Sequence, residues 1–228
     1  MSDWRAEALG EDVLLLRFGD RIDVAINQRV HALAAKITAR RPSWLQDVVP
    51  AYASLALFVD RNAFAADVDP LSETERWLQA QAFAVDVDND TIPGRSIEVP
   101  VRYGGEDGPD LDDLARHAGL SIEETVLRHA GGDYRVAMLG FAAGFPYLLG
   151  MDAALAMPRL QTPRTRVAAG SIAIGGAQTG IYPRQGPGGW RIIGRTDCAL
   201  FDPVRAPPTL IAPGDRVRFV AIDVRNPQ

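Results

Sequence analysis

Hydrophobic and polar positions follow two periods over the first 90 residues, and together they predict a small layer of strands and helices. Short apolar runs at 13–18 and 54–59 are typical of buried strands. Between them, apolar side chains recur at three- and four-residue steps over 26–37, behind the N-cap candidate Asp23. A second helix is expected to begin at Ser72, where a capping-box spacing opens.

A polar, turn-rich stretch at 88–94 interrupts these patterns and is a candidate linker. Because the composition changes beyond it, we expect two domains. The predicted boundary gives an N-terminal α+β domain over 1–92, with a small α/β sandwich-like core, and a second domain over 93–228.

The second half combines two short helices with many short strands. A strand at 97–101 precedes helices at 110–117 and after Ser121, and another strand follows at 134–139. Most of the 21 glycines and 16 prolines lie after residue 130, with further strand-length pieces between them. These pieces are 171–174, 179–182, 190–193 and 216–220. Strands and turns at this spacing indicate a barrel or sandwich, so the predicted fold class is α+β.

Composition removes several function classes. With a single cysteine and three histidines, the chain has no spacing suited to a structural zinc, and we expect no metal. Lys36 is the only lysine and falls in a predicted helix, so we expect no biotin attachment on this chain.

Charge and hydropathy bear on whether the protein binds nucleic acid and where in the cell it is expected. The net charge of −5 argues against nucleic-acid binding, because a phosphate backbone is usually met by a basic surface. No apolar run is long enough to cross a membrane, and the N-terminus lacks a secretory pattern. We therefore expect a cytoplasmic protein.

Local charge differs from the overall balance. Between residues 150 and 196 there are six arginines and one acid, Asp152. Since the guanidinium fork binds carboxylates and phosphates, this segment is a candidate anion site. The alternative is that some of these arginines cover apolar barrel surface or pair with acids from the N-terminal half.

Other chemical signals in the chain are weaker. The glycine-rich loop 175–180 could offer backbone amides to an anion, or it could be a tight hairpin. His31, His117 and His129 fall on predicted helices without an evident catalytic partner, so we interpret them as structural.

Six ordered motifs carry a family resemblance. They are 141–148 (FAAGFPYL), 162–167 (TPRTRV), 170–174 (GSIAI), 178–183 (QTGIYP), 187–190 (PGGW) and 193–196 (IGRT). In this respect the chain strongly resembles the KipI/PxpB family, also called allophanate hydrolase subunit 1 or the first half of the carboxyltransferase domain. The resemblance extends upstream to 100–105 (PVRYGG) and covers essentially the whole chain.

The resemblance implies a fold and a function. It implies a small α+β domain followed by a cyclophilin-like β-barrel. It also implies the PxpB-type component of an ATP-dependent 5-oxoprolinase, which acts with a KipA-like (PxpC) component and a LamB/YcsF-like (PxpA) component. ATP, with Mg²⁺ shared with a partner chain, would activate the lactam before its hydrolysis to glutamate.

The resemblance leaves two alternatives open. One is a KipI-type inhibitor of a sensor histidine kinase, and the other is half of a biotin-dependent urea carboxyltransferase. The genes that neighbour this one would discriminate between the three functions.

Within this scheme the chain offers binding groups, and no general base can be assigned. Arginines neutralise developing negative charge, and neutral polar groups orient a substrate. We expect anion contacts from Arg164, Arg166 and Arg195, and substrate orientation by Gln178 and Thr179. The expected cleft walls are Phe145, Tyr147, Tyr182 and Trp190.

Overall fold

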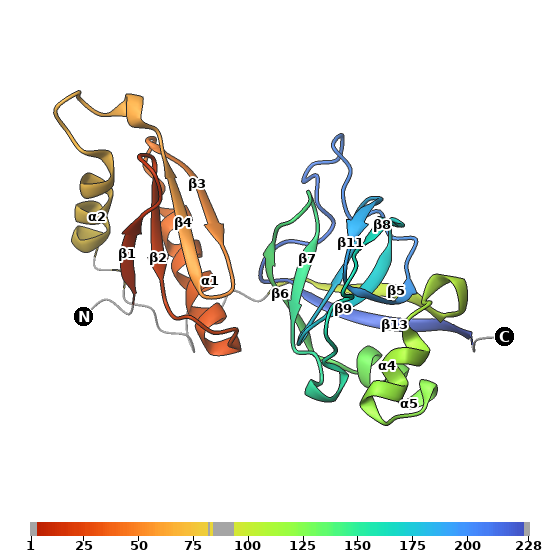
Figure 1. The fold of residues 1–228 in the computed structure, drawn as a ribbon. Coiled ribbons are helices and arrows are strands. Elements are labelled where there is room, and N and C mark those ends of the chain that lie inside the picture. Colours follow the sequence, from red (N-terminus) through yellow and green to blue (C-terminus); the bar gives the residue numbers. More distant parts are fainter. Residues whose placement is uncertain (1–3, 82, 84–93, 226–228) are drawn as a thin grey trace. The chain divides into compact units, whose positions relative to one another are not determined.

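The computed structural model describes residues 4–81, 83 and 94–225 (Figure 1). The chain divides into two compact units, residues 1–93 and residues 94–228. The expected boundary between 92 and 93, and all of the candidate linker except Gly94, lie outside the described residues. The position of the linker therefore stays a prediction.

The first unit is an antiparallel sheet with two helices on one face. Its strands, in the spatial order β1-β2-β4-β3, are β1 (Arg5–Ala8), β2 (Val13–Arg17), β4 (Ser54–Val59) and β3 (Leu45–Pro50). The helices are α1 (Val24–Ala39) and α2 (Pro70–Gln81). Leu14 pairs with Leu57 and Leu16 with Leu55, and these four buried side chains form the core with both helices. Lys36 lies in α1, as expected.

An aspartate carboxylate caps the start of each helix in this unit. The Asp23 carboxylate accepts a hydrogen bond from the Ile26 N–H, which confirms the predicted start of α1. The predicted start of α2 at Ser72 is wrong. The helix begins at Pro70, and the Asp69 carboxylate accepts hydrogen bonds from the backbone N–H and hydroxyl of Ser72. Proline suits the first helical position because its missing N–H would have no partner there.

The second unit is a closed barrel. Its seven strands are β5 (Ser96–Gly104), β6 (Tyr134–Leu139), β7 (Pro146–Leu149), β9 (Ser171–Gly175), β10 (Gln178–Ile181), β12 (Arg191–Arg195) and β13 (Arg216–Arg225). The order is β10-β7-β6-β13-β5-β12-β9, and β9 pairs with β10 to close the sheet. Only the β5–β13 pair is parallel among the described strands. The expected α+β class with a β-barrel is confirmed.

Two helices and a short ribbon complete this unit. Helices α4 (Leu111–Ala118) and α5 (Ile122–Ala130) pack against β12 and β13. Gly119 ends α4 in the left-handed conformation, and the Ser121 hydroxyl caps α5 by accepting from the Glu124 N–H. A two-stranded ribbon is formed by β8 (Arg164–Val167) and β11 (Gly186–Gly188). No helix in the described parts of the chain is long and apolar enough to span a bilayer.

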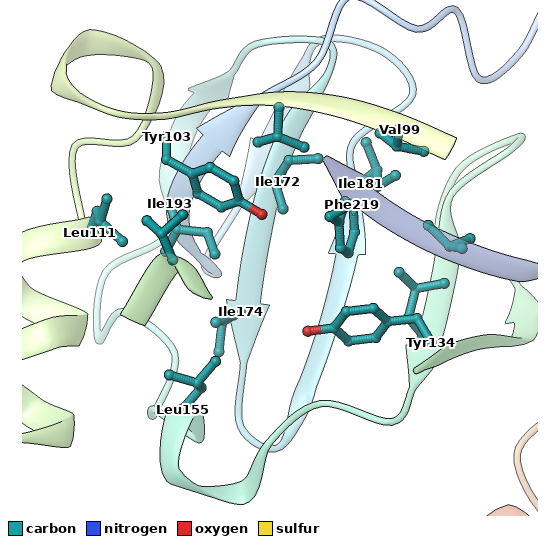
Figure 2. Packing of buried hydrophobic residues seen from close by; sticks show 14 of the residues in the cluster. Val99, Tyr103, Leu111, Tyr134, Leu155, Ile172, Ile174, Ile181, Ile193 and Phe219 are labelled. Carbon is teal, nitrogen blue, oxygen red and sulfur yellow. The ribbon is translucent and has the colours of Figure 1, made fainter. Parts of the chain in front are cut away.

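Large apolar side chains fill the barrel interior (Figure 2). Alternate residues of β9, Ile172 and Ile174, point inward, where they meet Tyr103 of β5 and Phe219 of β13. All four side chains are buried. The interior is thus a packed core, and any site must lie elsewhere on the barrel.

One buried polar chain crosses this core. The Tyr103 hydroxyl lies 2.8 Å from His129 Nδ1, and His129 Nε2 lies 3.1 Å from the Thr179 hydroxyl. Thr179 in turn donates to the Ala173 carbonyl at 3.0 Å. With its proton used there, Thr179 accepts from Nε2–H, and Nδ1 accepts from Tyr103. His129 is therefore structural, as expected, and its partners are the buried hydroxyls of Tyr103 and Thr179.

Burial determines how His129 titrates. The ring is fully enclosed and stacks on Phe219, with ring centroids 4.7 Å apart. Desolvation disfavours the charged form and lowers the pKa of His129 from 6.5 to about 3. Between these two values the unfolded chain binds a proton that the folded barrel does not. Stability is therefore lost as the pH falls through this range.

We expect the free energy of unfolding of the barrel to fall by about 2 kcal/mol between pH 7 and pH 5 because of His129. Hydrogen exchange of the barrel-strand amides, corrected for intrinsic rates, measures this without contribution from the N-terminal unit. His129→Gln keeps a hydrogen-bonding side chain and removes the titration. An equally steep pH dependence in this variant would contradict the assignment.

Candidate functional site

An aromatic cluster lies on the outer face of the barrel wall. The Phe145 ring centroid is 4.9 Å from that of Tyr147, 5.2 Å from Tyr182 and 5.5 Å from Trp190. Ala173 and Ile192 of the barrel and Val167 of the ribbon complete the cluster. The structure therefore brings together all four residues that we expected to form cleft walls.

These rings form a small hydrophobic core, which corrects the prediction that they line an open cleft. Phe145 is 2% exposed, Tyr182 3% and Trp190 5%, while Tyr147 is partly exposed. Phe141, at the edge of the cluster, is 64% exposed and meets Phe145 and Tyr182 edge-on. The accessible aromatic surface is thus supplied by Phe141 and Tyr147.

Two glycines make room for these rings. A Cβ on Gly175 would lie 2.6 Å from the Trp190 indole, and a Cβ on Gly188 would lie 2.2 Å from the Tyr182 hydroxyl oxygen. Gly175 also pairs with Gln178, so the glycine-rich loop is the tight hairpin between β9 and β10. The glycines of this loop make room for the aromatic rings and form the turn. We therefore interpret the loop as a structural hairpin and not as an anion-binding loop.

The loop before Phe145 is strained and hollowed. Phe141 has φ +63°, the left-handed conformation that bulky side chains avoid. Residues 139–144 line an open hollow of about 340 Å³. Such strain, of about 1–3 kcal/mol, persists where the surroundings impose it and is frequent at functional sites.

Arg164 already has an anionic partner. Its guanidinium donates to both oxygens of the Asp110 carboxylate, at 2.7 and 2.9 Å. That carboxylate also accepts from the Ile192 N–H at 2.6 Å, and its side chain is 6% exposed. The expected anion contact of Arg164 is therefore corrected, because an acid of the same unit satisfies it.

The other two predicted arginines lie in different settings. Arg195 donates through Nε to the Ala169 carbonyl at 3.1 Å, and its NH1 lies 3.9 Å from an Asp107 oxygen. Arg166, on β8, is exposed, and its side chain forms no hydrogen bond or ion pair within the described residues. Anion binding by Arg166 and Arg195 stays a prediction.

Gln178 and Thr179 face opposite sides of the barrel wall. Thr179 points inward and is fully buried in the polar chain with His129. Substrate orientation by Thr179 is therefore corrected. Because successive strand residues alternate, Gln178 lies on the outer face with the aromatic cluster. Its proposed contact with substrate stays open to test.

Two tyrosine hydroxyls at the cluster remain protonated at neutral pH. Desolvation raises the pKa of Tyr147 and of Tyr182, and the nearby cation of Arg159 opposes both shifts. These hydroxyls can donate or accept hydrogen bonds but do not serve as bases at pH 7.

Sequence reasoning misses three features of this surface. The pattern marks Asp110 only as a helix start, since its partner Arg164 lies 54 residues away. Phe141 falls inside a motif, but its conformation leaves no local signal. Arg159 is one of the six arginines of its segment, and nothing in the spacing distinguishes it from the others.

Comparison with known proteins extends these observations. The family model described as "Carboxyltransferase domain, subdomain C and D" matches residues 4–211. A curated protein of Bacillus subtilis (strain 168), named as the B subunit of 5-oxoprolinase, is 40% identical, covering 98% of this chain and 95% of its own. One of the same name from Escherichia coli O157:H7 is 38% identical, covering 95% of each chain.

Two solved structures are similar to this chain in sequence and in fold. A crystal structure of TTHA0988 is 39% identical with a TM-score of 0.77, covering 95% of this chain. This chain spans only 41% of the TTHA0988 chain. The protein PH0987 from Pyrococcus horikoshii is 43% identical with a TM-score of 0.56, covering 96% of this chain and 98% of its own.

A more distant structure shares the fold alone. The urea carboxylase of Kluyveromyces lactis has a TM-score of 0.72 at 17% identity, covering 96% of this chain and 22% of its own.

Asp110→Asn should destabilise the second unit strongly. The change leaves Arg164 without its buried counter-charge, which costs about 3 kcal/mol and lowers the melting temperature by about 10 °C. Thermal unfolding measures the effect. Asp112→Asn breaks an exposed ion pair with Arg116 on the same helix and serves as the control, with a shift of at most about 2 °C. Equal shifts in the two variants would contradict the assigned role of Asp110.

Proposed function

This chain belongs to the carboxyltransferase-domain family, subdomains C and D, and from this membership we propose that it is the B subunit of an ATP-dependent 5-oxoprolinase. The observation that carries the proposal is the named set of relatives. Three curated proteins that bear this subunit name are 38–47% identical to it, and two of them align along 95% or more of both chains.

The proposed reaction opens the lactam ring of 5-oxoproline to glutamate. An unstrained amide resists water at neutral pH, and phosphorylation of its oxygen by ATP would make the carbonyl carbon reactive. Water would then cleave the carbon–nitrogen bond and release phosphate. Charge builds up on oxygen atoms throughout, so cations and hydrogen-bond donors are the groups that accelerate such a reaction.

This chain supplies part of such a site. It offers the outer aromatic surface with the partly exposed Tyr147, and the arginines Arg166 and Arg195. Within the described residues, no three His, Cys, Asp or Glu side chains gather as they would around a metal ion. Mg²⁺ bound to ATP takes most of its ligands from phosphate oxygens and water and needs only one or two protein carboxylates. We propose that this Mg²⁺ is shared with a partner chain, and we derive no step through it.

The proposed partners are a KipA-like protein and a LamB/YcsF-like protein, in the cytoplasm. More than half of the TTHA0988 chain lies beyond the part that aligns with this protein, which is consistent with a second component fused there. Phe141 is the side chain that we assign to the KipA-like partner. It is exposed, has a strained backbone and is one of the residues that line the hollow, and binding would remove its apolar ring from water.

We expect glutamate formation from 5-oxoproline and ATP only when this chain is mixed with both partners. Each component is omitted in turn, and glutamate and ADP are measured. Activity that persists without this chain, or silence from a verified complex, would contradict the proposal. Inhibition of a histidine kinase and biotin-dependent carboxylation of urea would then be tested.

Phe141→Ala should reduce the affinity for the KipA-like partner about tenfold, because one buried aromatic side chain is commonly worth about 1–2 kcal/mol at an interface. Calorimetric titration measures the affinity. Leu127→Ala, which removes a 72% exposed side chain from α5, is the matched control and should bind as the wild type does. Unchanged affinity of the Phe141 variant would rule out this contact.

A further inference from the structure

The backbone around Arg159 is fixed from both sides. Met157 and Gly176 exchange two backbone hydrogen bonds, at 3.1 and 2.8 Å. The Leu160 N–H donates to the Gly189 carbonyl at 2.7 Å. Arg159 is thus anchored between the β9–β10 hairpin and the turn that precedes Trp190.

Its side chain is also held. The guanidinium carbon lies 5.5 Å from the centroid of the Trp190 ring, within the range of a cation–π interaction. Trp190 itself is immobilised in the aromatic cluster and lies against Gly175. The positive charge of Arg159 also acts electrostatically on the hydroxyls of Tyr147 and Tyr182 and opposes the rise in their pKa.

The guanidinium nonetheless has no anionic partner. Arg159 is exposed, and it forms no hydrogen bond or ion pair with any residue in the described parts of the chain. A positively charged fork that is oriented by a ring, with its N–H groups unused, is the arrangement that binds a planar oxyanion.

The other five arginines of the segment differ from Arg159. Three have polar partners: Arg164 with Asp110, Arg191 with the Pro158 carbonyl, and Arg195 with the Ala169 carbonyl. Arg166 and Arg184 are exposed, and no described residue stacks on their guanidinium groups or bonds to them. Arg159 alone of the six combines an unpaired charge with a fixed position among the described residues.

We propose that Arg159 binds the carboxylate of the lactam substrate, an assignment that rests on the proposed 5-oxoprolinase function. One fixed guanidinium balances the single negative charge of a carboxylate, whereas the triphosphate of ATP requires several cations. The partly exposed Tyr147, 5.8 Å from Trp190 between ring centroids, adds a hydroxyl next to the same surface. The group that this site takes is therefore a carboxylate, which on the proposed function is that of a small cyclic amide.

The test is Arg159→Gln in the complete complex with both partners. We expect the KM for 5-oxoproline to rise by about 10- to 100-fold, the loss typical of a charge-assisted hydrogen-bonded pair, with the KM for ATP within about twofold of wild type. Arg159→Lys keeps the positive charge but lacks the planar guanidinium. Its KM for 5-oxoproline should lie between the values of the wild type and of Arg159→Gln. Arg184→Gln, in the same segment, is the matched control and should retain both constants.

A lactam without a carboxylate provides a second measurement. ATP hydrolysis is measured with 2-pyrrolidinone in place of 5-oxoproline. The wild type should strongly prefer 5-oxoproline, and Arg159→Gln should lose most of that preference. A raised KM for ATP with an unchanged KM for 5-oxoproline would assign Arg159 to phosphate and overturn the proposal. Unchanged constants for both substrates would also overturn it.

The failure of this proposal can be told from failure of the proposed function. If the verified wild-type complex does not consume 5-oxoproline, the proposed function has failed. Calorimetric titration of that complex then decides on Arg159. Binding of 5-oxoproline, but not 2-pyrrolidinone, that is lost in Arg159→Gln supports the carboxylate site, and equal binding by variant and wild type overturns it.

Discussion

One carboxylate, that of Asp110, fixes the surface on which the candidate site is built. It lies just before helix α4, accepts the Ile192 N–H of strand β12, and binds the guanidinium of Arg164 from strand β8. Three elements that are distant in sequence are thereby joined at a buried point. Because the group is almost fully removed from water, each of these bonds is needed to compensate its lost hydration. The ribbon of β8 and β11 keeps its position over the barrel wall through this ion pair.

The aromatic cluster depends on that position. Val167 of the ribbon packs with Trp190 and Phe145 against the outer wall, and the indole lies close against Gly175, where any Cβ would collide. This packing restricts the orientation of the Arg159 side chain, because its guanidinium stacks on the Trp190 ring, which the cluster holds in place. The same barrel wall therefore carries an apolar core inside and an ordered, charged surface outside, since its strands alternate between the two faces.

Local sequence signals are sufficient to predict the helices and strands, but not the side-chain contacts between them. Helix α1 and helix α5 are predicted correctly because Asp23 and Ser121 cap their own helices within three residues. The predictions for Arg164 and Thr179 are wrong because their partners lie 54 and 50 residues away. A count of charge along a segment cannot distinguish a paired arginine from an unpaired one. The burial of the aromatic cluster likewise depends on the ribbon, which has no periodic pattern of its own.

The groups on this surface bear on the proposed need for a partner chain. A hydrolytic step requires a base near neutral pH, and the described residues of the barrel provide none at the aromatic surface. His129 is enclosed in the core with its pKa lowered to about 3, and burial raises the pKa of Tyr147 and Tyr182. This face carries the fixed cation of Arg159 and the exposed ring of Phe141, groups that are suited to binding a substrate or partner rather than to transferring a proton. The proposed division of labour is that this chain orients the lactam and a partner chain supplies the base.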